Sequence, residues 1–215
     1  YKSVALTSSG CCDAKVFVII VENLRLIARR GIIMAIVYKN FRGDLYYLHS
    51  RKTKKGNTTY HFSKKDSGSL VDEMPSGYEI YESPNGKVYL RKPLKKLIHD
   101  EEIKIIEEGM KKYCPIKDFK LEIKKDVVSI YTVENDLSFI KEIIPIRMDL
   151  DRYKNYETVM RFRLVDKENR IFSVERFCFL GSIDDWMEID ESEDLRRLVK
   201  EYVRHIGQES LYDLF

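Results

Sequence analysis

One stretch of the chain, from Gly43 to Arg91, constrains the fold more than any other, because aromatic and β-branched residues recur there between tight-turn signals. Four such segments are expected to be strands: Leu45–Ser50, Thr58–Ser63, Tyr78–Glu82 and Lys87–Arg91. A basic link ending in Gly56-Asn57 separates the first two, and Ser83–Gly86 separates the last two. Proline presets one turn angle, and Asn-Gly accepts the positive φ of a tight reversal. The stretch therefore predicts two β-hairpins.

The rest of the chain adds helices and further strands. Two helices are expected, Asp100–Tyr113 and Glu193–Ile206, because apolar residues recur at helical spacing in both. Four more segments are expected to be strands: Phe119–Ile123, Val127–Val133, Tyr156–Val165 and Arg170–Leu180. A short helix is expected from residue 135 or 136 to Ile144, where Pro145 stops it. The prediction is an α+β protein in which antiparallel β-hairpins form one or two sheets, with two main helices packed on them.

Composition divides the chain into three regions. Residues 34–98 are a basic β-hairpin region, and residues 99–215 are an α+β region that continues the same domain or makes a second compact one. Residues 1–33 differ from both, and Met34 is a plausible native start, so we expect 1–33 to be an N-terminal extension. The alternative is a genuine core strand at Val16–Val21. No apolar run reaches the roughly 20 residues of a membrane span.

Charge is distributed unevenly along the sequence. Residues 1–38, 39–125 and 126–215 carry net charges of +3, +7 and −7. A basic front half and an acidic back half predict either a surface that faces a polyanion or two faces that attract each other. The four cysteines include no C-x-x-C pair, which favours a reducing, cytoplasmic compartment.

The first hairpin is the leading candidate binding site. Its candidate contacts to nucleic acid are Arg51, Lys52, Lys54, Lys55 and Lys64, with Tyr47 and Tyr60 as stacking rings. Cations bind phosphates through counterion release, and exposed aromatic rings stack on bases. Two alternatives stay open: an acidic protein partner, and an ordinary exposed hairpin whose lysines protect a sheet edge from aggregation.

Two resemblances bear on this stretch. From Leu45 to Phe62, the order of strand, Lys-Lys-Gly link and aromatic strand resembles the small three-stranded arm-binding domains of tyrosine recombinases, but no recombinase catalytic tyrosine context follows. More widely, YYLHSRKTKKGNTTYHFSKK, GYEIYESPNGKVYLRK and RFCFLGSIDDWMEI resemble a group of conserved uncharacterised microbial proteins of unknown function. The second resemblance implies no activity.

A second candidate site follows the break at Gly181-Ser182. Asp184 and Asp185 come directly after a buried strand, where their oxygens suit Mg²⁺ or Ca²⁺. Three arginines of the neighbouring strands are candidates for holding an anion: Arg161, Arg163 and Arg176. In the alternative reading Asp184 caps a helix or turn, and Trp186 fills the core.

The sequence contains no P-loop, no G-x-S-x-G, no H-E-x-x-H and no G-x-G-x-x-G, and it assigns no cofactor. The leading hypothesis is a non-catalytic binding or adaptor module whose basic face meets nucleic acid or an acidic partner. The second is a metal-assisted hydrolase or transferase that acts on a phosphorylated substrate. The third is a structural subunit of a homo-oligomer.

Overall fold

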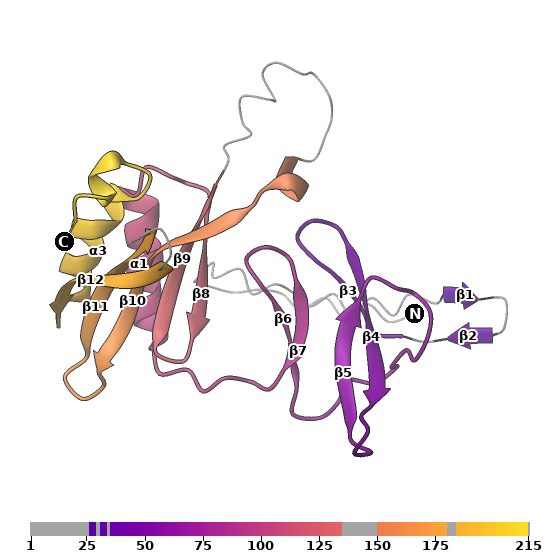
Figure 1. Cartoon of the computed structure of the whole chain (residues 1–215). Coiled ribbons are helices and arrows are strands. Elements are labelled where there is room, and N and C mark those ends of the chain that lie inside the picture. Colours follow the sequence, from indigo (N-terminus) through magenta and orange to yellow (C-terminus); the bar gives the residue numbers. More distant parts are fainter. Residues whose placement is uncertain (1–25, 29–30, 34, 135–149, 180–183, 215) are drawn as a thin grey trace, which may run out of the picture.

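The computed structural model describes residues 26–28, 31–33, 35–134, 150–179 and 184–214. Over these residues the chain is an α+β protein of antiparallel sheets and two α-helices, as the sequence predicts (Figure 1). Three expected features lie outside the described residues: the short helix that ends at Ile144, the segment Val16–Val21, and Met34.

Seven short strands make up the first part of the described chain: β1 (Leu26–Ala28), β2 (Gly31–Ile33), β3 (Val37–Lys39), β4 (Leu45–Lys52), β5 (Thr58–Ser63), β6 (Glu79–Glu82) and β7 (Val88–Arg91). The order β3-β4-β5 forms a three-stranded sheet, while β1 pairs with β2 and β6 with β7. Leu48, which is fully buried on β4, and Val37 on β3 belong to the core of this part. Both hairpins predicted between Gly43 and Arg91 are present.

Five further strands form the second sheet region: β8 (Phe119–Lys124), β9 (Val127–Val133), β10 (Tyr156–Asp166), β11 (Ile171–Phe179) and β12 (Asp184–Ser192). Their spatial order is β12-β11-β10-β9-β8, so each strand pairs with its neighbours in sequence. The sheets are more numerous than the expected one or two, because β7 contacts β5 without joining its ladder. The first and second parts lie at opposite ends of the molecule (Figure 1).

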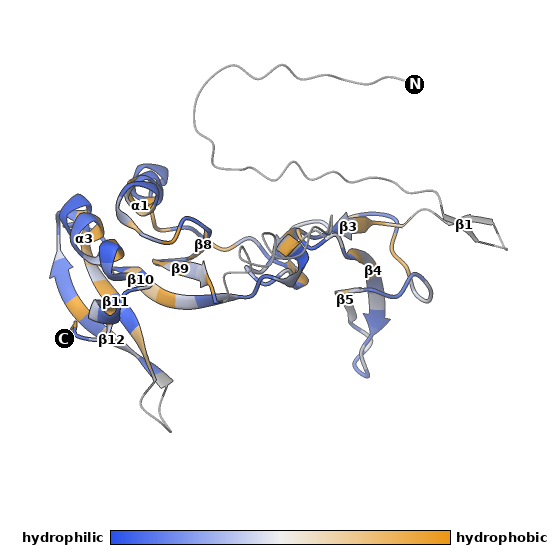
Figure 2. Ribbon diagram, turned by 90° about the horizontal axis from the view of Figure 1, so that it is seen from above, coloured by the Kyte–Doolittle hydropathy of each residue, from blue (hydrophilic) through white to orange (hydrophobic). Residues whose placement is uncertain are grey.

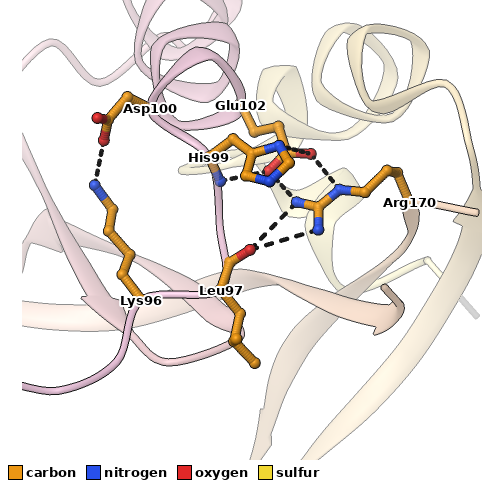
Figure 3. A network of polar contacts seen from close by, with 6 residues as sticks. All are labelled: Lys96, Leu97, His99, Asp100, Glu102 and Arg170. Atoms are coloured by element: carbon orange, nitrogen blue, oxygen red, sulfur yellow. Dashed lines mark hydrogen bonds and ion pairs between the residues drawn. The ribbon is translucent and has the colours of Figure 1, made fainter. Parts of the chain in front are cut away.

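Helix α1 (Asp100–Tyr113) has the predicted bounds, and it is tied to the sheet at its first turn. Glu102 accepts a hydrogen bond from the backbone nitrogen of His99 (2.7 Å) and forms an ion pair with Arg170, which lies in the turn between β10 and β11 (Figure 3). Arg170 also donates to the carbonyl of Leu97 (3.4 Å). These contacts anchor the start of α1 against the end of a sheet hairpin.

Helix α3 (Leu195–Tyr202) is shorter than the expected Glu193–Ile206. Asp194 caps it by accepting from the backbone nitrogen of Arg197 (3.0 Å), and its last turn tightens into the 3-10 helix η2 (Val203–His205). Two further 3-10 turns flank the sheet, η1 (Leu150–Tyr153) and η3 (Glu209–Leu211).

Both helices cover the same face of the five-stranded sheet (Figure 2). One apolar cluster joins α1, α3 and the sheet, and its fully buried members include Ile106, Met110, Val128, Phe162 and Leu198. The opposite face of the sheet carries polar side chains, among them Arg161, Arg163 and Glu175, because alternate residues of a strand point to opposite faces.

Gly109 sets the distance between α1 and α3. A Cβ atom at this position would lie 2.0 Å from Cγ1 of Val199. Ala normally stabilises a helix interior by about 1 kcal/mol relative to Gly. Here we expect Gly109→Ala to lower the free energy of unfolding by about 1–3 kcal/mol, since the added methyl overpacks the contact.

Chemical denaturation of Gly109→Ala measures this effect, with Val199→Ala as the matched single variant. The double variant should recover part of the loss, because removing the Val199 methyl groups makes room for the new Cβ. A Gly109→Ala protein that is more stable than the wild type would contradict this packing.

The first part (β1–β7) contacts the second part (β8–β12) through the turn between β6 and β7 and through Phe41, which follows β3. Asn85 bonds the backbone of Tyr156 twice, donating to its carbonyl and accepting from its nitrogen at 2.8 Å each. The ammonium of Lys120 on β8 donates to the carbonyl of Pro84 (2.7 Å) and lies 3.1 Å and 4.0 Å from the ring centroids of Phe41 and Tyr156. The turn between β6 and β7 is thereby docked onto the five-stranded sheet.

Candidate nucleic-acid interface

The turn between β4 and β5 projects from the three-stranded sheet. The ladder ends at the pair Lys52 and Thr58, and the turn is closed by a bond from the backbone nitrogen of Thr53 to the carbonyl of Asn57 (2.8 Å). Gly56 has φ +82, a conformation in which side chains are strained. The turn therefore has a defined shape, and it is hydrophilic throughout (Figure 2).

Four cations of the predicted site gather at this end of the hairpin: Arg51, Lys52, Lys54 and Lys55. All four are exposed, and no Asp or Glu occurs in the sequence between Asp44 and Asp66. In the part of the chain that the structure describes, none of the four pairs with a carboxylate. Their positive charge is left uncompensated.

Lys64, the fifth predicted cation, is placed differently. Its ammonium lies 2.8 Å from a carboxylate oxygen of Asp44, at the base of the hairpin. This contact raises the pKa of Lys64 and lowers that of Asp44. Lys64 is thus neutralised and separate from the four cations near the turn.

The two predicted stacking rings do not present open faces. The ring of Tyr47 belongs to the core and is only 8% exposed, because it points to the same side of the sheet as Val37. Tyr60 is half-buried and makes an edge contact with Tyr78 at a centroid distance of 6.2 Å. Burial therefore removes Tyr47 from the interface, and Tyr78 occupies one side of Tyr60.

His49 and His61 form a cross-strand pair on β4 and β5. Their rings stack at 5.5 Å, and Nε2 of the buried His49 donates to the carbonyl of Lys65 (3.0 Å). Among the described residues no group of three or more His, Cys, Asp or Glu side chains is arranged to hold a metal ion. The stacked rings and the bond to Lys65 link the two strands to the loop that follows β5.

A surface that the sequence analysis missed lies on β6 and β7. Tyr81 faces Tyr89 across the ladder, with centroids 6.2 Å apart and ring planes 26° apart. The guanidinium of Arg91 covers the Tyr81 ring at 3.8 Å. Tyr89 is 46% exposed. The turn Ser83–Gly86 fixes the register of the two strands. Counting residues outward from this turn would have predicted that Tyr81 and Tyr89 lie opposite each other on one face.

The three predicted anion-binding arginines do not converge. Arg161 and Arg163 both bind the carboxylate of Glu175, which is 2% exposed, and the Arg163 contacts measure 2.6 and 2.8 Å. Arg161 also stacks over the ring of Trp186 at 4.1 Å. Arg176 lies on the other face, where it donates to the carbonyl of Leu214 (2.9 Å).

The acidic pair at the start of β12 differs from its prediction. Asp184 and Asp185 are strand residues that pair with β11, and neither caps a helix. The exposed Asp185 accepts a bond from the backbone nitrogen of Trp186 (2.7 Å). The side chain of Asp184 lies outside what the structure describes. Trp186 is half-buried against Phe177 and is not a core plug.

Two open hollows occur elsewhere on the described surface. One, of about 460 Å³, lies between α1 and α3 and has side chains of both signs along it, including Glu108, Asp194 and Arg197. The other, of about 350 Å³, lies beside Gly207 and Tyr212. Neither is lined by a residue of the predicted sites. The charged residues along the second hollow are all acidic: Glu134, Glu157 and Glu209.

Comparisons with protein-family models, with curated proteins and with solved structures found no match for this chain. The resemblances noted from the sequence therefore stay predictions. Among the described residues, no helix has the length and apolar character needed to cross a membrane. Any account of function has to start from the surface chemistry of the chain.

Proposed function

We propose that this protein is a nucleic-acid-binding module whose β4–β5 turn contacts phosphates. One observation carries the proposal: Arg51, Lys52, Lys54 and Lys55 are exposed together, without a carboxylate partner in the described part of the chain. A protein that neutralises phosphates releases condensed counterions, which gives affinity independent of sequence. Elsewhere many cations are held by a carboxylate, as Arg170 is by Glu102.

The position of the lysines favours binding over protection of a sheet edge. Lysines that protect an edge lie along the exposed strand. Lys54 and Lys55 instead lie in the turn, beyond the last ladder pair between Lys52 and Thr58. A turn that carries cations beyond its sheet can approach a phosphate backbone closely, as two-stranded ribbons do in the grooves of DNA.

A nucleic acid fits better than an acidic protein, the other partner considered from the sequence. Phosphates are spaced regularly along a strand, so neighbouring cations of one turn can each meet one. The exposed ring of Tyr89 on the adjoining hairpin, which lies beside that of Tyr81, suits bases. A cytoplasmic location belongs to the proposal and is supported by the buried free thiols of Cys114 and Cys178.

The test is a pair of substitutions in the turn, Lys54→Ala with Lys55→Ala. Four phosphate contacts predict a log–log salt slope of about −3.6 on duplex DNA and about −2.8 on a single strand. Removing two contacts should reduce the magnitude of the slope by about 1.8 or about 1.4, respectively. Fluorescence anisotropy of labelled oligonucleotides at several salt concentrations measures this. The melting temperature should not change, because both lysines are exposed.

The matched control removes two exposed cations from α3, Arg196→Ala with Lys200→Ala. It makes the same change in net charge at the opposite end of the molecule (Figure 1). If both double variants weaken binding equally, only net charge matters and the turn is not the site. Binding to poly-glutamate with none to DNA or RNA at low salt would favour the acidic-protein partner.

A further inference from the structure

We propose that the outward face of β6–β7, formed by Tyr81, Tyr89 and Arg91, stacks the bases of single-stranded nucleic acid and makes the module prefer single strands to duplexes. This inference rests on the proposed function, since it names the form of nucleic acid that the same module binds. It is carried by separate residues on a separate hairpin, so it can fail while the proposed function holds.

The three side chains form one layered platform. Arg91 lies over one ring at 3.8 Å from the centroid of Tyr81, and Tyr81 lies beside Tyr89 across the strands. Glu79 holds Arg91 in place through an ion pair of 2.8 Å. The layer is therefore fixed before any ligand arrives, which reduces the entropy lost on binding.

The platform faces away from the core. The opposite face of the same hairpin carries Val88, which is 5% exposed, and Glu82, which accepts bonds from the hydroxyl of Tyr38 (2.7 Å) and the backbone of Phe41 (2.9 Å). That face joins the hairpin to the three-stranded sheet. With 46% of its surface exposed, Tyr89 presents ring surface to solvent.

The platform is continuous with the phosphate-binding turn. Strand β7 contacts β5, and it runs from the Ser83–Gly86 turn toward the end of the molecule where the β4–β5 turn projects (Figure 1). Lys92, the residue after β7, is exposed and has no carboxylate partner among the described residues. The platform and the cationic turn thus lie on neighbouring hairpins, so one strand of nucleic acid can contact both.

Single strands fit this surface and duplexes do not. Bases in a duplex are stacked on one another, so their faces are closed to a side chain. The bases of a single strand are open to stacking on aromatic rings, and this stacking tolerates any sequence because every base has a π-face. The cationic turn meets phosphates of either form, whereas the tyrosine platform is useful only with single strands.

The experiment compares Tyr89→Ala and Tyr89→Phe with the wild type. The probes are a single-stranded oligonucleotide of about 12 nucleotides, its duplex, and an abasic strand of the same length. Tyr89→Ala should weaken binding to the single strand by roughly 5- to 150-fold and leave the duplex and abasic strand within about twofold. Tyr89→Phe keeps the ring and should bind as the wild type does.

Two further variants keep the result interpretable. Tyr212→Ala removes another exposed tyrosine, 64% exposed near the C-terminal end, and should bind unchanged. Tyr89→Leu keeps apolar bulk on β7 without a π-face, and it replaces Tyr89→Ala if that variant unfolds. Its loss on the single strand should match that of the Ala variant.

Each outcome decides the matter. Equal wild-type affinity for single strand and duplex, with Tyr89→Ala unchanged on both, overturns the platform while leaving phosphate binding at the turn intact. If the wild-type protein binds none of the three probes at low salt, both the proposed function and the platform are overturned. A selective loss on the single strand supports both.

Discussion

Replacing Glu175 by Ala is expected to lower the free energy of unfolding by about 3 kcal/mol, near the lower end of the range for breaking a buried ion pair. Glu175 is 2% exposed and is the shared counter-charge of Arg161 and Arg163. Without it, two guanidinium groups face each other on one sheet face. We expect a loss of stability near the lower end of that range because the Arg163 side chain is 41% exposed and partly solvated.

Denaturation by guanidinium measures the loss, and the matched control is Glu188→Ala. Glu188 pairs with Glu175 across the β11–β12 ladder but is exposed, so its removal should change stability by less than about 0.5 kcal/mol. Adding Arg163→Ala to Glu175→Ala should recover part of the loss. Equal stability of Glu175→Ala and the wild type would mean that the arginines do not need this carboxylate.

The stability of the wild-type protein is expected to rise by about 2 kcal/mol between pH 8 and pH 10, through Lys120. Burial against Phe41 and Tyr156 lowers the pKa of Lys120 to about 8, although the nearby carboxylates of Glu82 and Asp118 act in the opposite direction. An unfolded lysine keeps its proton to about pH 10.5. The unfolded state therefore binds more protons in this window, so stability increases with pH.

Above pH 10 the trend should reverse. Burial is the main cause that raises the pKa of Tyr131 to about 12, and likewise that of Tyr202 to about 12. The unfolded state then loses tyrosine protons first, which lowers stability as the pH rises. Urea unfolding from pH 7 to pH 11 measures both limbs.

Lys120→Met is the control, because it keeps the length of the side chain and removes the titrating ammonium. The rise between pH 8 and pH 10 should disappear in this variant, while the fall above pH 10 should remain. If stability depends on pH identically in the wild type and Lys120→Met, Lys120 does not titrate in this range.

Much of the secondary structure follows from local signals. The α1 helix and strands β5 and β9 have their predicted bounds, because caps, prolines and strict alternation mark them in the sequence. Strand β12 was not predicted. It is an edge strand with a solvated face, so its polar residues, beginning with Asp184 and Asp185, gave no apolar pattern.

The sequence predicts the cluster of cations at the candidate site, but it does not predict which aromatic rings are exposed there. Four adjoining cations without an intervening acid are visible in the sequence, and the tight turn with Gly56 keeps them together. Which aromatic rings are covered depends on contacts between segments far apart in sequence, such as that of Tyr60 with Tyr78. Tyr47 is buried and Tyr89 is 46% exposed.

The arginine site illustrates the same limit. Alternation on β10 places Arg161 and Arg163 on one face, as the sequence indicates. The register of β10 with β11 decides that Glu175 meets both, and alternation along β11 turns Arg176 to the helical face with Val174. A phosphorylated substrate at Arg161 and Arg163 would have to compete with a carboxylate that is already bound, so the second hypothesis from the sequence gains no support here.

We propose that the β4–β5 turn and the adjoining platform together bind nucleic acid. Nuclear magnetic resonance of the ¹⁵N-labelled protein, titrated with a single-stranded oligonucleotide at low salt, tests it most directly. We predict shifts of backbone amide signals concentrated at Arg51–Thr58 and around Tyr81 and Tyr89, with the amides of α1 and α3 unchanged. Absence of shifts, or shifts confined to the face around Arg161 and Glu175, would contradict the account.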